Sequence, residues 1–218
     1  MNCEVIELEI NWLETENIFE SRIEKEFKDL KRRIKATRQS RIEASKRLRM
    51  KHNYFEKITH FYSLVVLILS VWFLNQSGHT GLVAAKVLLV LSLSLTYFTM
   101  FLSMRNYKER AGDFENNYQQ LDVLINKIDR FKSGNKELND ETLKEFQREY
   151  EKLIIGKENH TNVDFYISNG DNREKFKKAI LIYKTKEKVL NVLIAMYPIL
   201  LIILIFLFSS LMKIINKF

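Results

Sequence analysis

The sequence predicts an all-α membrane protein: a two-helix transmembrane hairpin, extended by a cytosolic antiparallel helical stalk, plus a third C-terminal transmembrane helix. Three apolar stretches without Asp, Glu, Lys or Arg carry this prediction: residues 58–74, 87–104 and 189–212. A helix needs about 20 apolar residues to cross the hydrocarbon core of a bilayer, within a range of about 17–25. All three stretches meet this requirement, and the charged residues gather in the segments between them.

The predicted spans divide the chain into regions. Residues 1–57 form an acidic N-terminus and a basic cytosolic helix, and residues 58–104 form the hairpin, with spans at 58–75 and 82–104. Residues 105–188 form a cytosolic helical region, and residues 189–212 form the third span. The alternative is a soluble protein that buries these stretches as core helices. It is disfavoured because a soluble domain of this size rarely needs several wholly apolar segments.

Lysine and arginine flank the spans unevenly, and cytoplasmic flanks are the ones enriched in these residues. The connector Asn75–Thr80 carries no charge, whereas basic residues precede the first span and follow the second. Basic residues also precede the third span, so we expect a cytoplasmic N-terminus and an external C-terminus. The flanking residues are Arg41, Lys46, Arg47, Arg49, Lys51, Lys57, Arg105, Lys108, Arg110, Lys175, Lys177, Lys178, Lys184, Lys186 and Lys188.

The first cytosolic arm predicts one long helix. Its acidic residues 1–20 fit a half-exposed strand and a helix alike, so both remain open for that segment. From Ile18 an apolar stripe recurs at helical spacing, and no Gly or Pro interrupts the chain before Gly78. The first apolar stretch begins so late that no cleavable signal peptide is expected. Cys3, the only cysteine, cannot form an internal disulfide, which fits a reducing compartment.

The second cytosolic arm carries the most regular pattern in the chain. Its apolar residues step by four and three over three heptads, which predicts a coiled-coil seam. The seam needs a partner, either the arm that enters the first span or the same seam of a neighbouring subunit. The residues of this pattern are Tyr107, Ala111, Phe114, Tyr118, Leu121, Ile125 and Ile128. We name Tyr107, Phe114, Tyr118, Leu121 and Ile125 as the candidate cytosolic interaction seam.

Capping signals divide the rest of the cytosolic region. Residues 133–135 break the second arm, and Asn139 begins a short helix that stops at Gly156. Thr161 and Asp164 fit a capping box for a brief helix that ends near residues 169–170. We then expect Asn172 to cap a long helix that enters the third span, where Pro198 should kink it.

Hydroxylated side chains form a stripe in the second span. Ser92, Thr96, Thr99 and Ser103 share one helix face, which is expected to turn away from lipid. They can line a polar passage or let helices approach closely, and both readings remain open. Lys86 lies one turn inside the external end of this span. Its ammonium can snorkel to the interface, or it can belong to a ring of lysines around an oligomeric pore.

Enzyme chemistry finds little support. The chain has no nucleotide-binding glycine motif, no zinc-protease motif and no cysteine pair, so no catalytic residue, metal site or cofactor is expected. Glu158, Asn159, His160 and Asp164 do gather in a short stretch. A capped turn explains this stretch without catalysis, and it is also a candidate for sensing a signal.

The chain resembles a known family in its order of segments. A basic helix at residues 38–47 leads into the hairpin, the helix from Tyr107 to Phe131 follows, and residues 150–153 precede the stretch from Glu158 to Tyr166. Together these resemble the SLATT proteins, two-transmembrane effectors associated with SMODS nucleotidyltransferases and SLOG sensor domains. The similarity extends over nearly the whole chain and is greatest to the branch with a third, C-terminal membrane helix.

The resemblance implies a role in bacterial antiviral immunity. A genetically linked nucleotidyltransferase or reverse transcriptase would detect infection, in many cases through a nucleotide second messenger. The SLATT protein would then form a homo-oligomer and permeabilise the inner membrane. The alternative is a non-conducting membrane scaffold that recruits a cytosolic enzyme through its helical stalk. A transporter subunit is disfavoured because the spans contain no Asp, Glu or Arg to couple transport.

Overall fold

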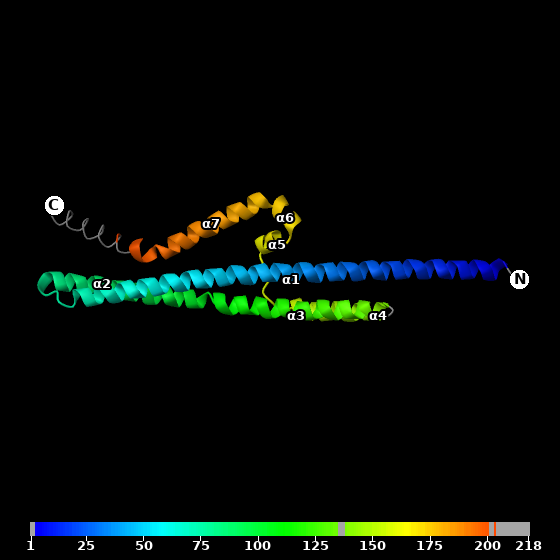
Figure 1. Cartoon of the computed structure of the whole chain (residues 1–218), viewed down its shortest axis with the longest axis horizontal. Coiled ribbons are helices and arrows are strands. Elements are labelled where there is room, and N and C mark those ends of the chain that lie inside the picture. The colour runs from blue at the N-terminus through cyan, green and yellow to red at the C-terminus, as the bar shows by residue number, and fades with distance from the viewer. Residues whose placement is uncertain (1–2, 135–137, 201–202, 204–218) are drawn as a thin grey trace. The chain divides into compact units, whose positions relative to one another are not determined.

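The structure is a computed structural model that describes residues 3–134, 138–200 and 203, with side chains from residue 22 onward. All regular elements in these ranges are α-helices, which confirms the all-α prediction (Figure 1). The chain divides into two compact units. We call Met1–Lys46 with Gly112–Lys177 the bundle unit, and Arg47–Ala111 with Lys178–Phe218 the hairpin unit.

Helix α1, Cys3–Phe73, runs through both units without a break. It contains no Gly or Pro, so no residue interrupts its backbone hydrogen bonds. The predicted continuous helix from the charged arm into the first apolar stretch is therefore confirmed. The alternative left open for residues 1–20 is decided as well, because the backbone is helical from Cys3.

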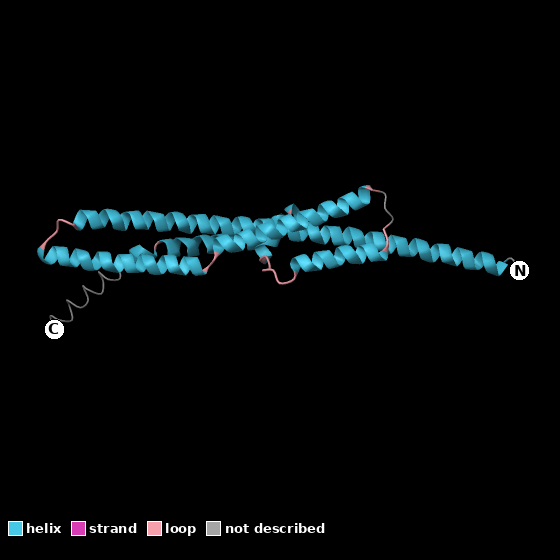
Figure 2. Cartoon of the chain, turned by 90° about the horizontal axis from the view of Figure 1, so that it is seen from below, coloured by secondary structure: helices cyan, strands magenta, loops and turns pink. Residues whose placement is uncertain are grey.

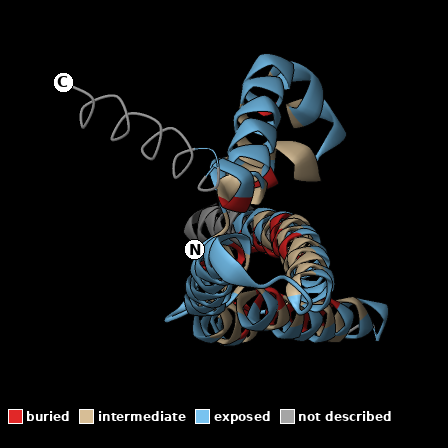
Figure 3. Cartoon of the chain, turned by 90° about the vertical axis from the view of Figure 1, so that its left-hand side faces the viewer, coloured by how far each residue is buried: buried red, intermediate tan, exposed pale blue. Residues whose placement is uncertain are grey.

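The bundle unit packs α1 against α3, Tyr107–Ser133, and α4, Asp140–Ile154. As numbering rises along α1 from Lys31 to Arg38, the α3 partner falls from Asp129 to Asp122, so the two helices are antiparallel. Figure 3 colours the buried positions of the helices red and the exposed positions pale blue. The shared core consists of Ile23, Phe27, Leu30, Ile34, Leu121, Leu124, Ile125, Ile128, Leu143 and Phe146.

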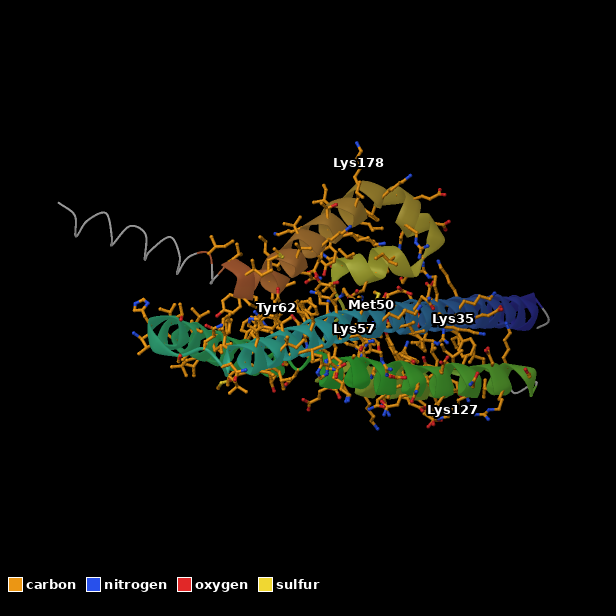
Figure 4. All side chains as sticks on the ribbon, turned by 60° about the vertical axis from the view of Figure 1, so that its left-hand side comes forward. Lys35, Met50, Lys57, Tyr62, Lys127 and Lys178 are labelled. Carbon is orange, nitrogen blue, oxygen red and sulfur yellow. The ribbon has the colours of Figure 1, made fainter. Side chains whose placement is uncertain are left out.

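Polar contacts fix α4 at the side of this core. The Tyr150 and Thr37 hydroxyl oxygens lie 2.8 Å apart, which joins α4 to α1. The Lys127 ammonium, labelled in Figure 4, donates to Glu149 at 2.6 Å and joins α4 to α3. The side chain of Asn139 accepts from the backbone N–H of Thr142 at 2.8 Å, so the predicted start of this helix is confirmed.

Two short helices follow α4. Helix α5, Asn162–Ser168, begins with a complete capping box between Thr161 and Asp164, as the sequence predicts. Helix α6, Gly170–Lys175, is capped by Asn169, whose side chain accepts from the N–H of Asp171 at 3.2 Å. The prediction that Asn172 caps a long helix is therefore wrong. Asn169 comes earlier in an extended conformation and caps first, so Asn172 falls inside α6.

The hairpin unit pairs the C-terminal part of α1 with α2, Gly78–Met104 (Figures 1 and 2). The turn between them spans only residues 74–77, because α2 begins at Gly78, whose backbone is left-handed (φ +70°). The helix thus begins before the predicted membrane span at 82–104, whose bounds stay a prediction. A Cβ atom at Gly81 would lie 2.3 Å from the Gln76 carbonyl oxygen. Glycine at this position is what permits the tight turn.

Helix α7, Lys177–Ala195, lies beside α1 in the hairpin unit. Lys51 pairs with Glu187 at 2.5 Å, and the Tyr62 hydroxyl donates to the Ala195 carbonyl at 2.9 Å. Residue numbers therefore increase in the same direction along α1 and α7, so the two helices are parallel. Helical backbone resumes at residues 197–200 after a turn at Met196. The kink predicted at Pro198 stays a prediction.

Among the described residues, two helices are long and apolar enough to cross a membrane, and they include the first two predicted apolar stretches. Only 6% and 17% of their apolar windows are buried, whereas the core helix of a soluble protein would be mostly buried. This exposure favours lipid over water as their solvent. The third predicted span, residues 189–212, lies in large part outside the described residues. In its described part, Val189, Leu190, Leu193 and Leu200 are exposed.

Candidate functional site

The hydroxyl stripe of α2 is exposed on the single chain. Ser92, Thr96, Thr99 and Ser103 are all accessible. Three of these hydroxyls are satisfied by carbonyls of their own helix: Ser92 donates to Leu88 at 2.8 Å, Thr96 to Ser92 at 2.9 Å and Thr99 to Leu95 at 2.7 Å. Thr99 and Ser103 also line a cavity whose other wall is α1 of the same unit. The Lys86 side chain is exposed as well.

A different face of α2 packs inside the hairpin unit. Its buried residues are Ala84, Leu91, Ser94 and Phe98. The Phe98 ring stacks on Tyr197 with centroids 6.1 Å apart, which brings the helical segment after α7 against the hairpin. Ser94 Oγ is buried without a hydrogen-bond partner among the described residues. Sequence reasoning missed Ser94, although its spacing from Leu91 and Phe98 places it on an apolar face.

The predicted interaction seam is largely internal. Phe114, Leu121 and Ile125 are buried, and the last two belong to the core shared with α1. Tyr107 stacks on Phe55 in the hairpin unit, with ring centroids 6.2 Å apart. Tyr118 is half-buried, and its hydroxyl lies 3.4 Å from a Glu115 carboxylate oxygen. The chain's own α1 thus supplies the partner that the heptad pattern requires.

A polar cluster interrupts the bundle core. The Arg41 guanidinium is only 3% exposed and donates to the Asn117 side-chain carbonyl. The Asn117 amide then donates to the backbone carbonyl of Leu153 at 2.7 Å, just before the chain leaves α4. Burial lowers the pKa of Arg41. Its Nε atom has no hydrogen-bond partner among the described residues.

His160 lies within electrostatic range of Arg41 and Asp164. Burial lowers the pKa of His160 first, the Arg41 charge lowers it further, and Asp164 opposes both. His160 Nδ1 is buried without a partner among the described residues, whereas Asp164 Oδ2 accepts from the Thr161 N–H at 2.9 Å and the Thr161 hydroxyl at 2.8 Å. The charges of Arg41 and Asp164 thus both act on His160. Glu158 and Asn159 are exposed.

Arg41 and Asn117 were missed from the sequence, although Arg41 carries a recognisable signal. Phe27, Ile34, Leu48 and Phe55 recur every seven residues along α1, and Arg41 occupies the same heptad position. A charged residue in an otherwise apolar heptad position marks a buried polar contact. No group of three or more His, Cys, Asp or Glu side chains within the described ranges is arranged to hold a metal ion.

Comparison with known proteins identifies a family. The family of SMODS and SLOG-associating 2TM effector domains, family 5 (SLATT_5), matches residues 23–211. No curated protein matches the chain. No solved structure matches it either. The matched range includes the candidate spans, the polar cluster and the described part of the third apolar stretch.

Proposed function

Because this chain belongs to family 5 of the SMODS and SLOG-associating two-transmembrane effectors, we propose that it permeabilises the bacterial inner membrane on receiving a defence signal. Family membership makes it a membrane effector of defence systems. Oligomerisation and the opening of a pore are the proposed steps, and they produce abortive infection by killing the infected cell.

The exposed hydroxyl stripe of α2 is the observation that carries this proposal. Ser92, Thr96 and Thr99 lie on a helix that is largely apolar, and all three are exposed. A polar stripe gains little from lipid, whereas it packs well against a second copy or lines water. Subunits that bring these stripes together would enclose a hydroxyl-lined path. Lys86 would lie near its external mouth.

The proposed orientation places both arms of the hairpin in the cytoplasm. The N-terminus is cytoplasmic, the third span crosses to the outside, and the C-terminus is external, as the flanking charges predict. The packing of Tyr197 on Phe98 supports a third span that lies against the hairpin. In this arrangement the bundle unit is the part that a cytosolic signal reaches.

The signal is proposed to act on the polar cluster of the bundle unit. Glu158 and Asn159 are exposed and precede His160 in the chain. The positive charge of the buried Arg41 acts on the His160 imidazole and lowers its pKa. A nucleotide second messenger made by a linked nucleotidyltransferase carries phosphate that suits cationic groups, whereas a linked reverse transcriptase would itself serve as the sensor. Such a ligand would compete with Asn117 for the Arg41 guanidinium. Losing this hydrogen bond would loosen the bundle core at its polar contact, because a buried polar group without a partner is costly.

Replacing Thr96 and Thr99 by Leu tests the path. The chain is expressed in bacteria together with its linked enzyme, and uptake of a membrane-impermeant dye is measured after activation. We expect the wild type to admit the dye and the double variant to lose most uptake while it remains in the membrane fraction. The matched control is Leu89→Phe, a bulky change at an exposed apolar site of the same helix. Normal uptake in the double variant would exclude the stripe as the path.

The alternative function, a scaffold that recruits an enzyme through the interaction seam, requires that seam to be accessible. Phe114, Leu121 and Ile125 are buried within the chain, so recruitment of an enzyme through that seam would require α3 to leave α1. Separating those helices would expose the core of the bundle unit to water, which is unfavourable. No described feature favours this function over permeabilisation.

A further inference from the structure

A cavity of about 630 Å³ lies within the hairpin unit, where α1 passes the junction of α2 and α3. Helix α2 ends at Met104 and α3 begins at Tyr107, whereas α1 continues unbroken. Between α2 and α3, Asn106 has a positive φ of 47°, a conformation that Asn tolerates better than most residues. Asn106 lines the cavity, so the cavity lies beside the non-helical residues that separate α2 from α3.

The cavity straddles the boundary that the sequence predicts for the membrane. Thr59, Thr99 and Ser103 belong to the ends of the two predicted spans, whereas Glu56 and Lys108 lie just outside them. This is the depth at which lipid headgroups and their glycerol backbones lie. A ligand here would therefore come from the membrane more readily than from solution.

The lining combines both signs of charge with an apolar wall. Glu56 and Glu109 supply carboxylates and Lys108 supplies an ammonium, while Phe55 and Leu102 supply apolar surface. Glu56 already lies 3.7 Å from the imidazole of His52, and its side chain is 53% exposed, so it remains open to a ligand. A ligand that matches this lining carries an anion, a hydrogen-bonding cation and an acyl chain.

We propose that this cavity binds the headgroup of phosphatidylethanolamine. Its primary ammonium would donate hydrogen bonds to Glu56 and Glu109, its phosphate would meet Lys108, and its glycerol end would lie against Phe55 and Leu102. Phosphatidylglycerol lacks the ammonium. Phosphatidylcholine carries a methylated cation that cannot donate hydrogen bonds to the carboxylates.

Native mass spectrometry of the detergent-purified full chain tests this site. Each of the three phospholipids is added separately, and its apparent Kd is measured. The wild type is expected to bind phosphatidylethanolamine about tenfold more tightly than phosphatidylcholine, because charge-assisted hydrogen bonds distinguish them. The double variant Glu56→Gln/Glu109→Gln should lose this preference while its phosphatidylcholine Kd stays unchanged. Both replaced side chains are exposed, so the fold should tolerate the change.

The control is Glu26→Gln, an exposed carboxylate of α1 in the bundle unit, which should keep the full preference. Thermal unfolding of all variants confirms that the fold is retained. Equal binding of the three lipids by the wild type would indicate adventitious lipid only and overturn the proposal. A preference that survives the double substitution would overturn it too. Membrane leakage is not part of this measurement, so the proposed function stands or falls separately.

Discussion

Arg41 and Asn117 form a polar contact in a core that is otherwise apolar. A guanidinium that is 3% exposed has lost most of its hydration, and its hydrogen bond to Asn117 replaces part of that loss. Buried polar pairs of this kind add little net stability, but they favour one register of two packed helices over its neighbours. The contact joins α1 to α3 at a single position, so we interpret it as a contact that fixes the register of these two helices. In the proposed function it is also the contact on which the signal acts.

A double-mutant cycle tests this role of the Arg41–Asn117 contact. Asn117→Leu should lower the free energy of unfolding by about 2–4 kcal/mol, because it leaves a buried guanidinium without its acceptor. Arg41→Leu/Asn117→Leu should regain most of that loss, because no uncompensated charge then remains. Chemical denaturation in detergent measures both variants and the second single variant, Arg41→Leu, which the cycle requires. Additive losses in the double variant would show that the two side chains do not interact.

His160 should make stability depend on pH. Its pKa in the folded chain is lowered from 6.5 by burial and by Arg41, so the unfolded chain binds the proton more readily. The contribution of neutral His160 to the free energy of unfolding is therefore fully present above about pH 6.5, its pKa in the unfolded chain. This contribution is lost as the pH falls through and below that value. Thermal unfolding between pH 5 and 8 should show this decline in the wild type and a flatter profile in His160→Gln. His79→Gln, in the exposed first turn of α2, is the control and should keep the wild-type profile.

At the scale of elements, local signals decided most of the helices. The long α1 follows from the absence of Gly and Pro, the Asn139 cap marks the start of α4, and a capping box marks the start of α5. Prediction failed where two signals compete. Asn169 and Asn172 both fit a cap, and the choice depends on the backbone of the preceding turn, which periodicity does not encode. Helix α2 begins at Gly78, before the predicted membrane span at 82–104, because the tight turn uses the positive φ of Gly78.

Two glycines give opposite expectations. Gly81→Ala would place a Cβ 2.3 Å from the Gln76 carbonyl oxygen, so the turn of the hairpin must open and the hairpin should be destabilised by about 1–3 kcal/mol. Gly112→Ala meets no atom within 4 Å in α3 and should stabilise the chain by about 1 kcal/mol, since Ala favours a helix more than Gly. Thermal unfolding in one detergent compares them. Similar shifts of the same sign would contradict the tight turn.

At the scale of the whole chain, the sequence predicts the fold better than the site. The apolar spans and the heptad seam depend on periodic patterns along one segment, which a single sequence displays directly. The polar cluster instead depends on a contact between Arg41 of α1 and Asn117 of α3. The cavity of the hairpin unit is likewise lined by residues of α1 and by residues around the break between α2 and α3. Such contacts arise from how helices pack in register, so sequence reasoning named His160 and Asp164 but missed their partners.

All proposals above depend on the α1–α2 hairpin crossing a bilayer while the bundle unit stays on one side. Labelling of single cysteines in living bacteria tests this claim, after Cys3→Ser has removed the native thiol. His79→Cys lies at the start of α2, beside the turn of the hairpin, and Gln119→Cys lies on the exposed side of α3. A membrane-impermeant maleimide should label the first variant in intact cells, and the second only after the cells are permeabilised. Labelling of Gln119→Cys in intact cells, or protection of both sites there, would contradict the account.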